Sequence, residues 1–340
     1  MFKKIFTFIK ETILEEYKLI IIMFILYLIL QIPLNYYIVV GGGSSDVSSR
    51  INVSNKYKSK GSFNISYVTE LQGTIFTYGL SYLIPTWERE SADNYKYSEK
   101  ESIEDIEFRG SLDLLTSNGN AIYWAYTKAN KEVKLKSNKL YIITIFDGYK
   151  TDLKVGDEVL SLDNNTYNTL DEYREYIQTK NENDTIIVKV KRNNKEKEIE
   201  TKVYKYKDRL ILGVGLQFVK EYDTDPEVKI KFRRSESGPS GGLITALEIY
   251  NQLTKKDLTK GKKITGTGTI EEDGTIGQIG GVEHKLLGAY DDKSDIFLVP
   301  DGQNYKDALK YKKEKKLKIK IIKVKTFEDA INKLENLKWE

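Results

Sequence analysis

The sequence predicts an α+β protein with more than one domain, and three observations support this class. The chain has 340 residues, of which 40% are hydrophobic and 31% charged, a composition typical of folded globular domains. Strand and helix patterns alternate over residues 206–340, which predicts a domain with a substantial core. Residues 130–205 show short strand patterns around one helix, so we expect a second, smaller module there.

An unbroken apolar run at Leu19–Leu30 predicts a transmembrane anchor over residues 19–40. As a helix, the 22 residues of this span would rise about 33 Å, which is enough to cross a bilayer. A cleaved signal peptide with its cut near Gly41 is one alternative, and a buried helix of a soluble domain is another.

Flanking charges give the anchor a predicted orientation. Four lysines precede the apolar run, namely Lys3, Lys4, Lys10 and Lys18, and the other flank has no positive charge before Arg50. The positive-inside rule then places residues 1–18 in the cytoplasm and the domains after residue 40 outside the cytoplasmic membrane. Residues 41–50, rich in glycine and serine, read as a flexible linker.

Composition excludes several classes of chemistry. The chain has no cysteine, which excludes disulfides, thiol catalysis and cysteine-based metal sites. A single histidine, His284, excludes zinc sites that need two histidines, so we expect neither a metal nor a cofactor. The net charge of +4, from 54 basic and 50 acidic residues, gives no indication of nucleic-acid binding.

Local patterns within these domains give more detailed expectations. Ser111–Lys128 has a helical apolar face, but Asn118-Gly119 interrupts it, so the helix is expected to begin after that point or to break there. Thr169 and Glu172 form a capping-box pattern that opens a helix. A β-hairpin is expected to turn at Asn193-Asn194.

The order of elements in residues 129–205, with the run Leu153–Leu160, resembles a PDZ domain. The resemblance implies capture of an extended peptide or protein segment by strand addition. Residues 130–140 contain no Gly-Leu-Gly-Phe-type loop, with which PDZ domains hold a peptide carboxylate. Recognition of a C-terminal carboxylate therefore stays open, as does an unrelated small α+β module.

Ser240 lies in a Gly-Pro-Ser-Gly-Gly turn that leads directly into an amphipathic helix pattern. Serine is a favoured helix N-cap, and on this stretch alone capping is the simpler interpretation. The same position also suits a nucleophile, because free N–H groups at a helix start can stabilise an oxyanion. Gly238 and Gly241 would let a substrate carbonyl approach closely.

A serine nucleophile needs a base, and two residues in the same short stretch are candidates. His284 beside Glu283 and Lys285 is typical of a solvated surface residue. Lys285 could accept a proton only if its pKa fell from about 10.4 towards about 7, a change of about 4–5 kcal/mol. Only a desolvated site can supply that, so a catalytic Lys285 must be buried near Ser240.

Two blocks of sequence, residues 237–254 and 265–289, resemble the signature blocks of the Lon proteolytic domain, a Ser-Lys peptidase. The resemblance implies that Ser240 is the nucleophile and that Lys285, 45 residues later, is the general base. It implies that Thr267 orients the lysine and that Gly238 and Gly241 support the turn or the oxyanion. Gly241 replaces the alanine that usually follows the serine.

The whole layout resembles the membrane-anchored, PDZ-containing Lon-like peptidases of the YlbL type. This implies a Lon proteolytic-domain fold built from residues 51–128 and 206–340, so that residues 41–128 comprise the linker and the first part of the peptidase domain. The PDZ-like module at 129–205 is inserted between the two parts. No G-x-x-x-x-G-K-[ST] loop is present, which predicts a peptidase that works without ATP. A catalytically inactive scaffold that binds a membrane or secreted partner is the alternative, and a homo-oligomer stays open because related domains often form rings.

Overall fold

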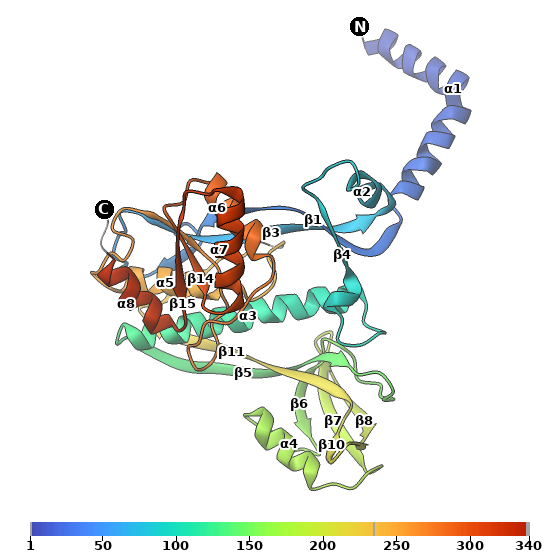
Figure 1. Cartoon of the computed structure of the whole chain (residues 1–340). Helices are drawn as coiled ribbons and strands as arrows, with labels where there is room; N and C mark the ends of the chain where they lie inside the picture. Colours follow the sequence, from blue (N-terminus) through green and yellow to red (C-terminus); the bar gives the residue numbers. More distant parts are fainter. Residues whose placement is uncertain (1, 234, 338–340) are drawn as a thin grey trace. The chain divides into compact units, whose positions relative to one another are not determined.

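The computed structural model describes residues 2–233 and 235–337 (Figure 1). It divides the chain into two compact units, which we describe separately. One unit comprises the residues up to Gly41 together with Thr69–Tyr95, and the other comprises Gly42–Val68 and the residues from Lys96 onward.

The first unit consists of helices and a small antiparallel pair of strands. It contains helix α1 (Phe2–Leu30), helix α2 (Ile75–Leu80), strand β4 (Glu88–Ser91) and the 3₁₀ helix η1 (Ala92–Tyr95). Strand β1 (Pro33–Asp46) begins in it and strand β3 (Ser62–Thr74) ends in it. β1 pairs with β4 from Tyr36 to Val39, and a capping box of Thr74 and Thr77 begins α2.

The predicted transmembrane helix over residues 19–40 is wrong. α1 ends at Leu30, and β1 begins at Pro33, because proline cannot donate the next helical hydrogen bond. Within the described part of the chain, no helix is both long enough and apolar enough to span a membrane.

The second unit contains a mostly parallel sheet. Strands β13 (Lys263–Gly266), β14 (Ile296–Pro300) and β15 (Lys320–Val324) pair in parallel, and β13 also pairs in parallel with β3. Helices α6 (Val282–Asp291), α7 (Gln303–Lys315) and α8 (Phe327–Asn336) alternate with these strands along the sequence. This alternation agrees with the predicted α+β class.

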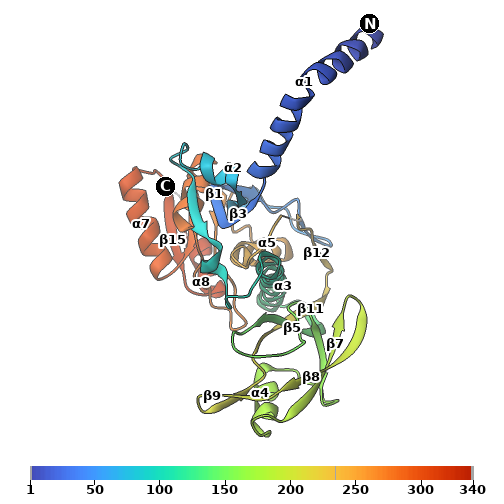
Figure 2. The same cartoon turned by 90° about the vertical axis from the view of Figure 1, so that its right-hand side faces the viewer.

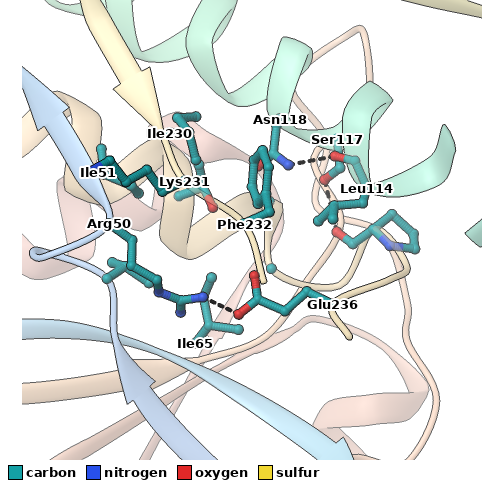
Figure 3. A pocket seen from close by; sticks show the side chains of 15 residues that line it. Arg50, Ile51, Ile65, Leu114, Ser117, Asn118, Ile230, Lys231, Phe232 and Glu236 are labelled. Carbon is teal, nitrogen blue, oxygen red and sulfur yellow. Dashed lines mark hydrogen bonds and ion pairs between the residues drawn. The ribbon is translucent and has the colours of Figure 1, made fainter. Parts of the chain in front are cut away.

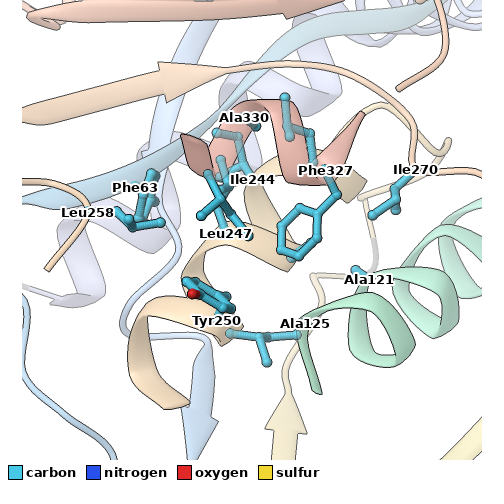
Figure 4. Packing of buried hydrophobic residues seen from close by; sticks show 14 of the residues in the cluster. Phe63, Ala121, Ala125, Ile244, Leu247, Tyr250, Leu258, Ile270, Phe327 and Ala330 are labelled. Atoms are coloured by element: carbon cyan, nitrogen blue, oxygen red, sulfur yellow. The ribbon is translucent and has the colours of Figure 1, made fainter. Parts of the chain in front are cut away.

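Helix α5 (Gly242–Leu253) is the centre of the core. All its residues are buried, which is typical of a helix that is covered on every side. In Figure 4, Ile244, Leu247 and Tyr250 of α5 lie among side chains of helix α3 (Ile103–Lys128) and of α8. The helix that begins beside Ser240 is therefore fixed along its whole length.

Two further expectations for this unit are wrong. Residues 41–50 are not simply a flexible linker, because β1 continues to Asp46. A side-chain carbon on Gly42 would lie 2.5 Å from the carbonyl oxygen of His284, so glycine permits a close approach to α6. α3 is not interrupted at Asn118-Gly119 either. A side-chain carbon on Gly119 would lie 2.6 Å from the carbonyl oxygen of Lys220, so this glycine also serves close packing.

The smaller module is a five-stranded antiparallel sheet in the order β11-β5-β6-β7-β8, with helix α4 (Leu170–Gln178). Its strands are β5 (Glu132–Ile145), β6 (Glu158–Leu162), β7 (Thr185–Arg192), β8 (Lys195–Lys202) and β11 (Val214–Asp225). The predicted turn at Asn193-Asn194 is confirmed by the β7–β8 pairing, and Thr169 caps α4. Strands β9 (Tyr204–Tyr206) and β10 (Arg209–Ile211) pair with each other, as do β12 (Val228–Ile230) and β2 (Ile51–Val53).

Strand β11 lies outside the range that we predicted for the smaller module. It pairs with β5 along nearly its whole length, from Val214 opposite Ile145 to Asp225 opposite Glu132. Figures 1 and 2 both show α3 running along these two strands. The chain therefore leaves this sheet through β11 and then reaches the turn that carries Ser240.

Candidate active site

Ser240 is not the N-cap of α5. Gly241 occupies that position, with helical backbone angles and no side-chain cap. The Ser240 side chain instead lies within hydrogen-bonding distance of the Lys285 amine, which donates to it. Gly238, two residues earlier, has φ +80°, a conformation that favours glycine and lets the chain turn into the helix.

Lys285 lies in the first half of α6, and its Nζ is 3.0 Å from Ser240 Oγ. The lysine is 6% exposed, whereas Ser240 is half-buried. The burial and proximity that the sequence required of a basic Lys285 are thus both present. His284, next to it on α6, is half-buried.

Thr267 contacts the backbone of Ser240. Its hydroxyl donates to the Ser240 carbonyl oxygen at 3.2 Å, and the Gly268 N–H donates to the same oxygen at 2.8 Å. The Thr267 N–H in turn donates to the Leu298 carbonyl on β14, so the threonine is tied to the central sheet. Thr267 is fully buried, and its contacts fix the position of Ser240.

Backbone N–H groups at the turn differ in their availability. Within residues 2–233 and 235–337, the amides of Ser240 and Gly241 donate to no other protein group. The Gly238 N–H is already used, because it donates to the Gly110 carbonyl at 2.8 Å. Of the glycines that we predicted here, Gly241 can thus offer a donor to an oxyanion, whereas Gly238 contributes the shape of the turn.

Helix α3 supplies partners of the turn that the sequence did not reveal. Ser117 Oγ donates to the Pro239 carbonyl at 2.8 Å, a contact seen in Figure 3. Asn120 donates to the Ile270 carbonyl at 2.9 Å. Both side chains are buried although they are polar. Polar residues on the inner face of a predicted helix were the available signal, but no spacing rule connects them with a turn more than 100 residues away.

A small cavity of about 40 Å³ adjoins the same turn (Figure 3). Pro239, Gly241 and Gly242 form one wall, and the others are mainly apolar, from Val47, Ile51, Ile65, Leu114, Ile230 and Phe232. Glu236, for which we assigned no catalytic role, forms an ion pair with Arg50 at this cavity. Glu236 therefore ties the segment before Ser240 to Arg50, which directly precedes β2.

Strand β11 is one of the two edge strands of its sheet, so a further strand could be added to it. The chain enters β11 through Leu212-Gly213, where Gly213 has φ +72°. A side-chain carbon on Gly213 would lie 2.4 Å from the Cβ of Tyr149, so the position requires glycine. The Leu212-Gly213 stretch follows strands β5 to β8 in the sequence. It therefore lies outside residues 130–140, where the sequence contains no Gly-Leu-Gly-Phe-type loop.

Comparisons with known proteins match two parts of the chain. Residues 130–203 match the PDZ domain family, and residues 233–336 match the Lon protease (S16) C-terminal proteolytic domain. The Lon protease of Aster yellows witches'-broom phytoplasma (strain AYWB) is 30% identical over 99 residues, which are 29% of this chain. The chain spans only 12% of that protein's length.

Two solved structures are similar to part of the chain. The PDZ domain of an SdrC-like protein from Listeria monocytogenes is 22% identical and has a TM-score of 0.23, covering 24% of this chain and 92% of that one. The second domain of a listeria protein is 21% identical, with a TM-score of 0.20, covering 26% and 88%.

The two family matches and the fold agree with the resemblance drawn from the sequence blocks. The match to the proteolytic domain includes Ser240, Thr267 and Lys285, and the match to the PDZ family includes β5 to β8. The chain therefore combines a PDZ domain with a Lon-type C-terminal proteolytic domain, the composition of a Lon-like PDZ-containing peptidase.

Proposed function

We propose that the chain is a serine endopeptidase that works without ATP and cleaves peptides or exposed protein segments by a dyad of Ser240 and Lys285. The observation that supports this most strongly is the 3.0 Å separation between Ser240 Oγ and the Nζ of a lysine that is 6% exposed. A nucleophile and a buried base within hydrogen-bonding reach are the arrangement that acyl transfer needs.

In this mechanism Ser240 Oγ attacks the scissile carbonyl while neutral Lys285 takes the hydroxyl proton. Lys285 then gives that proton to the leaving amine, and water later hydrolyses the acyl-enzyme by the reverse sequence. The free N–H groups of Ser240 and Gly241 support the negative charge on the tetrahedral oxygen. Thr267 holds the Ser240 carbonyl and so orients the nucleophile.

The PDZ domain supports peptide binding, and the place of β11 at the end of the strand order of its sheet favours capture of an extended segment by strand addition. Without an unfolding motor, the substrate has to be a short peptide, a disordered tail or an exposed loop. The glycine-containing stretch before β11 is the place in this module where a peptide carboxylate could approach the backbone.

The test is cleavage of a casein-like unstructured protein by the full chain, with and without ATP. We expect peptide release that is independent of ATP and that Ser240→Ala and Lys285→Ala each abolish. Release that survives either substitution would contradict the dyad. A wild-type chain that cuts nothing, yet still binds peptides, would favour the scaffold alternative.

The location of the peptidase domain outside the cytoplasmic membrane stays a prediction from the flanking charges, because no helix among residues 2–233 and 235–337 could span a membrane. Protease treatment of intact cells decides it, since protection of residues 51–340 would contradict an outside location. Light scattering of the purified chain decides whether it forms a homo-oligomer.

A further inference from the structure

Helix α3 contacts both the turn of Ser240 and the edge strand of the PDZ sheet. Figures 1 and 2 show it running along β11, and the same helix packs against α5 in the core. Some polar side chains of α3 contact the turn of Ser240, and others contact β11. The proposed mechanism assigns no role to this helix.

On the turn side, α3 holds the backbone just before the nucleophile at two points. The Gly110 carbonyl accepts from the Gly238 N–H, and Ser117 Oγ donates to the Pro239 carbonyl, each at 2.8 Å. Ser117 is 3% exposed, so water does not readily replace this bond. A side-chain carbon on Gly242 would lie 2.2 Å from Ser117 Oγ, which shows how closely the helix meets the start of α5.

On the strand side, Gln217 of β11 donates from Nε2 to two residues of α3. The acceptors are Asp113 Oδ1 at 3.1 Å and Thr116 Oγ1 at 3.0 Å. Thr116 directly precedes Ser117, so the two contacts lie on adjacent residues of one rigid helix. Gly119 adds a close backbone approach, since a side-chain carbon there would lie 2.6 Å from the Lys220 carbonyl.

Burial strengthens the link between α3 and β11. It raises the pKa of the Asp113 carboxyl, while the hydrogen bond from Gln217 lowers it, with smaller influences from Arg109 and Glu271. Loss of the Gln217 amide would therefore leave the half-buried Asp113 without this donor. A change at Gln217 in β11 therefore alters contacts of α3, the helix that holds the turn before Ser240.

We propose that Ser117 is a positioning residue for Ser240, and that Gln217 makes β11 part of the same support. This inference rests on the proposed function, because it assigns a support to the proposed nucleophile. It adds residues that act through the turn and touch no reacting atom.

The first test is Ser117→Ala in the full chain, measured by peptide cleavage. We expect kcat to fall about 10- to 100-fold with KM unchanged, because a misplaced nucleophile slows chemistry more than binding. Ser111→Ala is the matched control, since Ser111 Oγ donates only within α3, to the Phe108 carbonyl. Equal kcat values for the wild type and Ser117→Ala would overturn the assignment.

The second test is Gln217→Met, alone and combined with Ser117→Ala, with Glu221→Met at an exposed position of β11 as control. We expect Gln217→Met to lower kcat and the double variant to lose less than the product of the two single losses, because both act through α3. Unchanged kcat in Gln217→Met, or independent losses, would overturn the link to β11.

A third measurement separates this inference from the proposed function. Hydrogen exchange of the full chain reports on the turn without any need for activity. We expect Ser117→Ala to speed exchange of the Gly238 amide about tenfold, and Ser111→Ala to leave it unchanged. If the wild type lacks peptidase activity but this acceleration is seen, the proposed function fails and the support of the turn stands. If exchange is unchanged, the support itself is wrong.

Discussion

Lys285 Nζ donates to Ser240 Oγ across 3.0 Å, although the two residues are 45 positions apart, Ser240 in the turn before α5 and Lys285 on α6. Ser240 directly precedes the N-cap of the buried α5, and Lys285 lies on α6, whose inner face packs against β14 and α7. The distance between Lys285 Nζ and Ser240 Oγ is therefore set by the packing of the domain. This makes the pair sensitive to changes in charge and in volume.

Lys285→Arg tests whether the lysine must be able to lose its proton. Arginine keeps a hydrogen-bond donor near Ser240 but stays charged at any working pH, so it cannot act as a base. We expect cleavage to fall by about 10³-fold or more, as with Lys285→Ala. Peptide release is the measurement, and Lys310→Ala, at an exposed position of α7, is the control. Substantial activity in Lys285→Arg would exclude lysine as the base.

Gly241→Ala and Gly242→Ala are expected to differ sharply although they are neighbours. A Cβ on Gly241 would lie 3.0 Å from the end of the flexible Ile65 side chain, which can shift by a few tenths of an ångström. A Cβ on Gly242 would lie 2.2 Å from Ser117 Oγ and 2.8 Å from Ile270 Cγ2. We expect a stability loss under about 1 kcal/mol for the first and about 1–3 kcal/mol for the second. Urea unfolding measures both, and equal losses would contradict the packing described for this turn.

Thr267→Val removes the hydroxyl that donates to the Ser240 carbonyl while preserving shape. We expect a stability loss of about 1 kcal/mol and a several-fold decrease in kcat, because the Gly268 N–H still holds the carbonyl. Thr265→Val is the matched control, since Thr265 is also buried but shares its hydrogen bond with Ser294. The control should lose stability without a specific loss of kcat. If both variants lose the same kcat, the role given to Thr267 is wrong.

Glu248→Gln should stabilise the protein at neutral pH. Burial raises the pKa of the Glu248 carboxyl, although the hydrogen bond from Gln252 lowers it. A carboxyl whose folded pKa is raised binds more protons when folded, so wild-type stability falls as the pH rises from its usual pKa of about 4.5 through the folded pKa. The variant lacks this titration and keeps an acceptor for Gln252. Its advantage in urea unfolding should be largest at neutral pH and shrink on acidification; a constant difference would contradict the prediction.

The sequence predicted those parts of the fold and site that depend on local patterns. The turn at Asn193-Asn194 and the cap at Thr169 are encoded in a few adjacent residues. Ser240 and Lys285 were recognisable as a pair because each lies in its own sequence block, and the structure brings them together. The sequence also showed that Lys285 must be buried to act as a base, because only desolvation lowers the pKa of a lysine far enough.

What the sequence did not predict depends on long-range contacts. The apolar run after Leu19 suggested a helix that continues to residue 40, but α1 ends at Leu30, before Pro33. The glycines after residue 40 read as a linker, although they let β1 approach α6. The pairing of β11 with β5 was not visible in the sequence because β5 lies about 80 residues earlier. Ser240 suited a helix N-cap as well as a nucleophile, yet Gly241 is the N-cap of α5.

The most direct test of the central claim is labelling of the full chain with a serine-directed acylating probe, followed by intact mass measurement and peptide mapping. The dyad predicts one adduct per chain on Ser240, absent in Ser240→Ala and slowed by about 10³-fold or more in Lys285→Ala. Labelling of Ser240 at an unchanged rate in Lys285→Ala would contradict the claim that this lysine activates the serine.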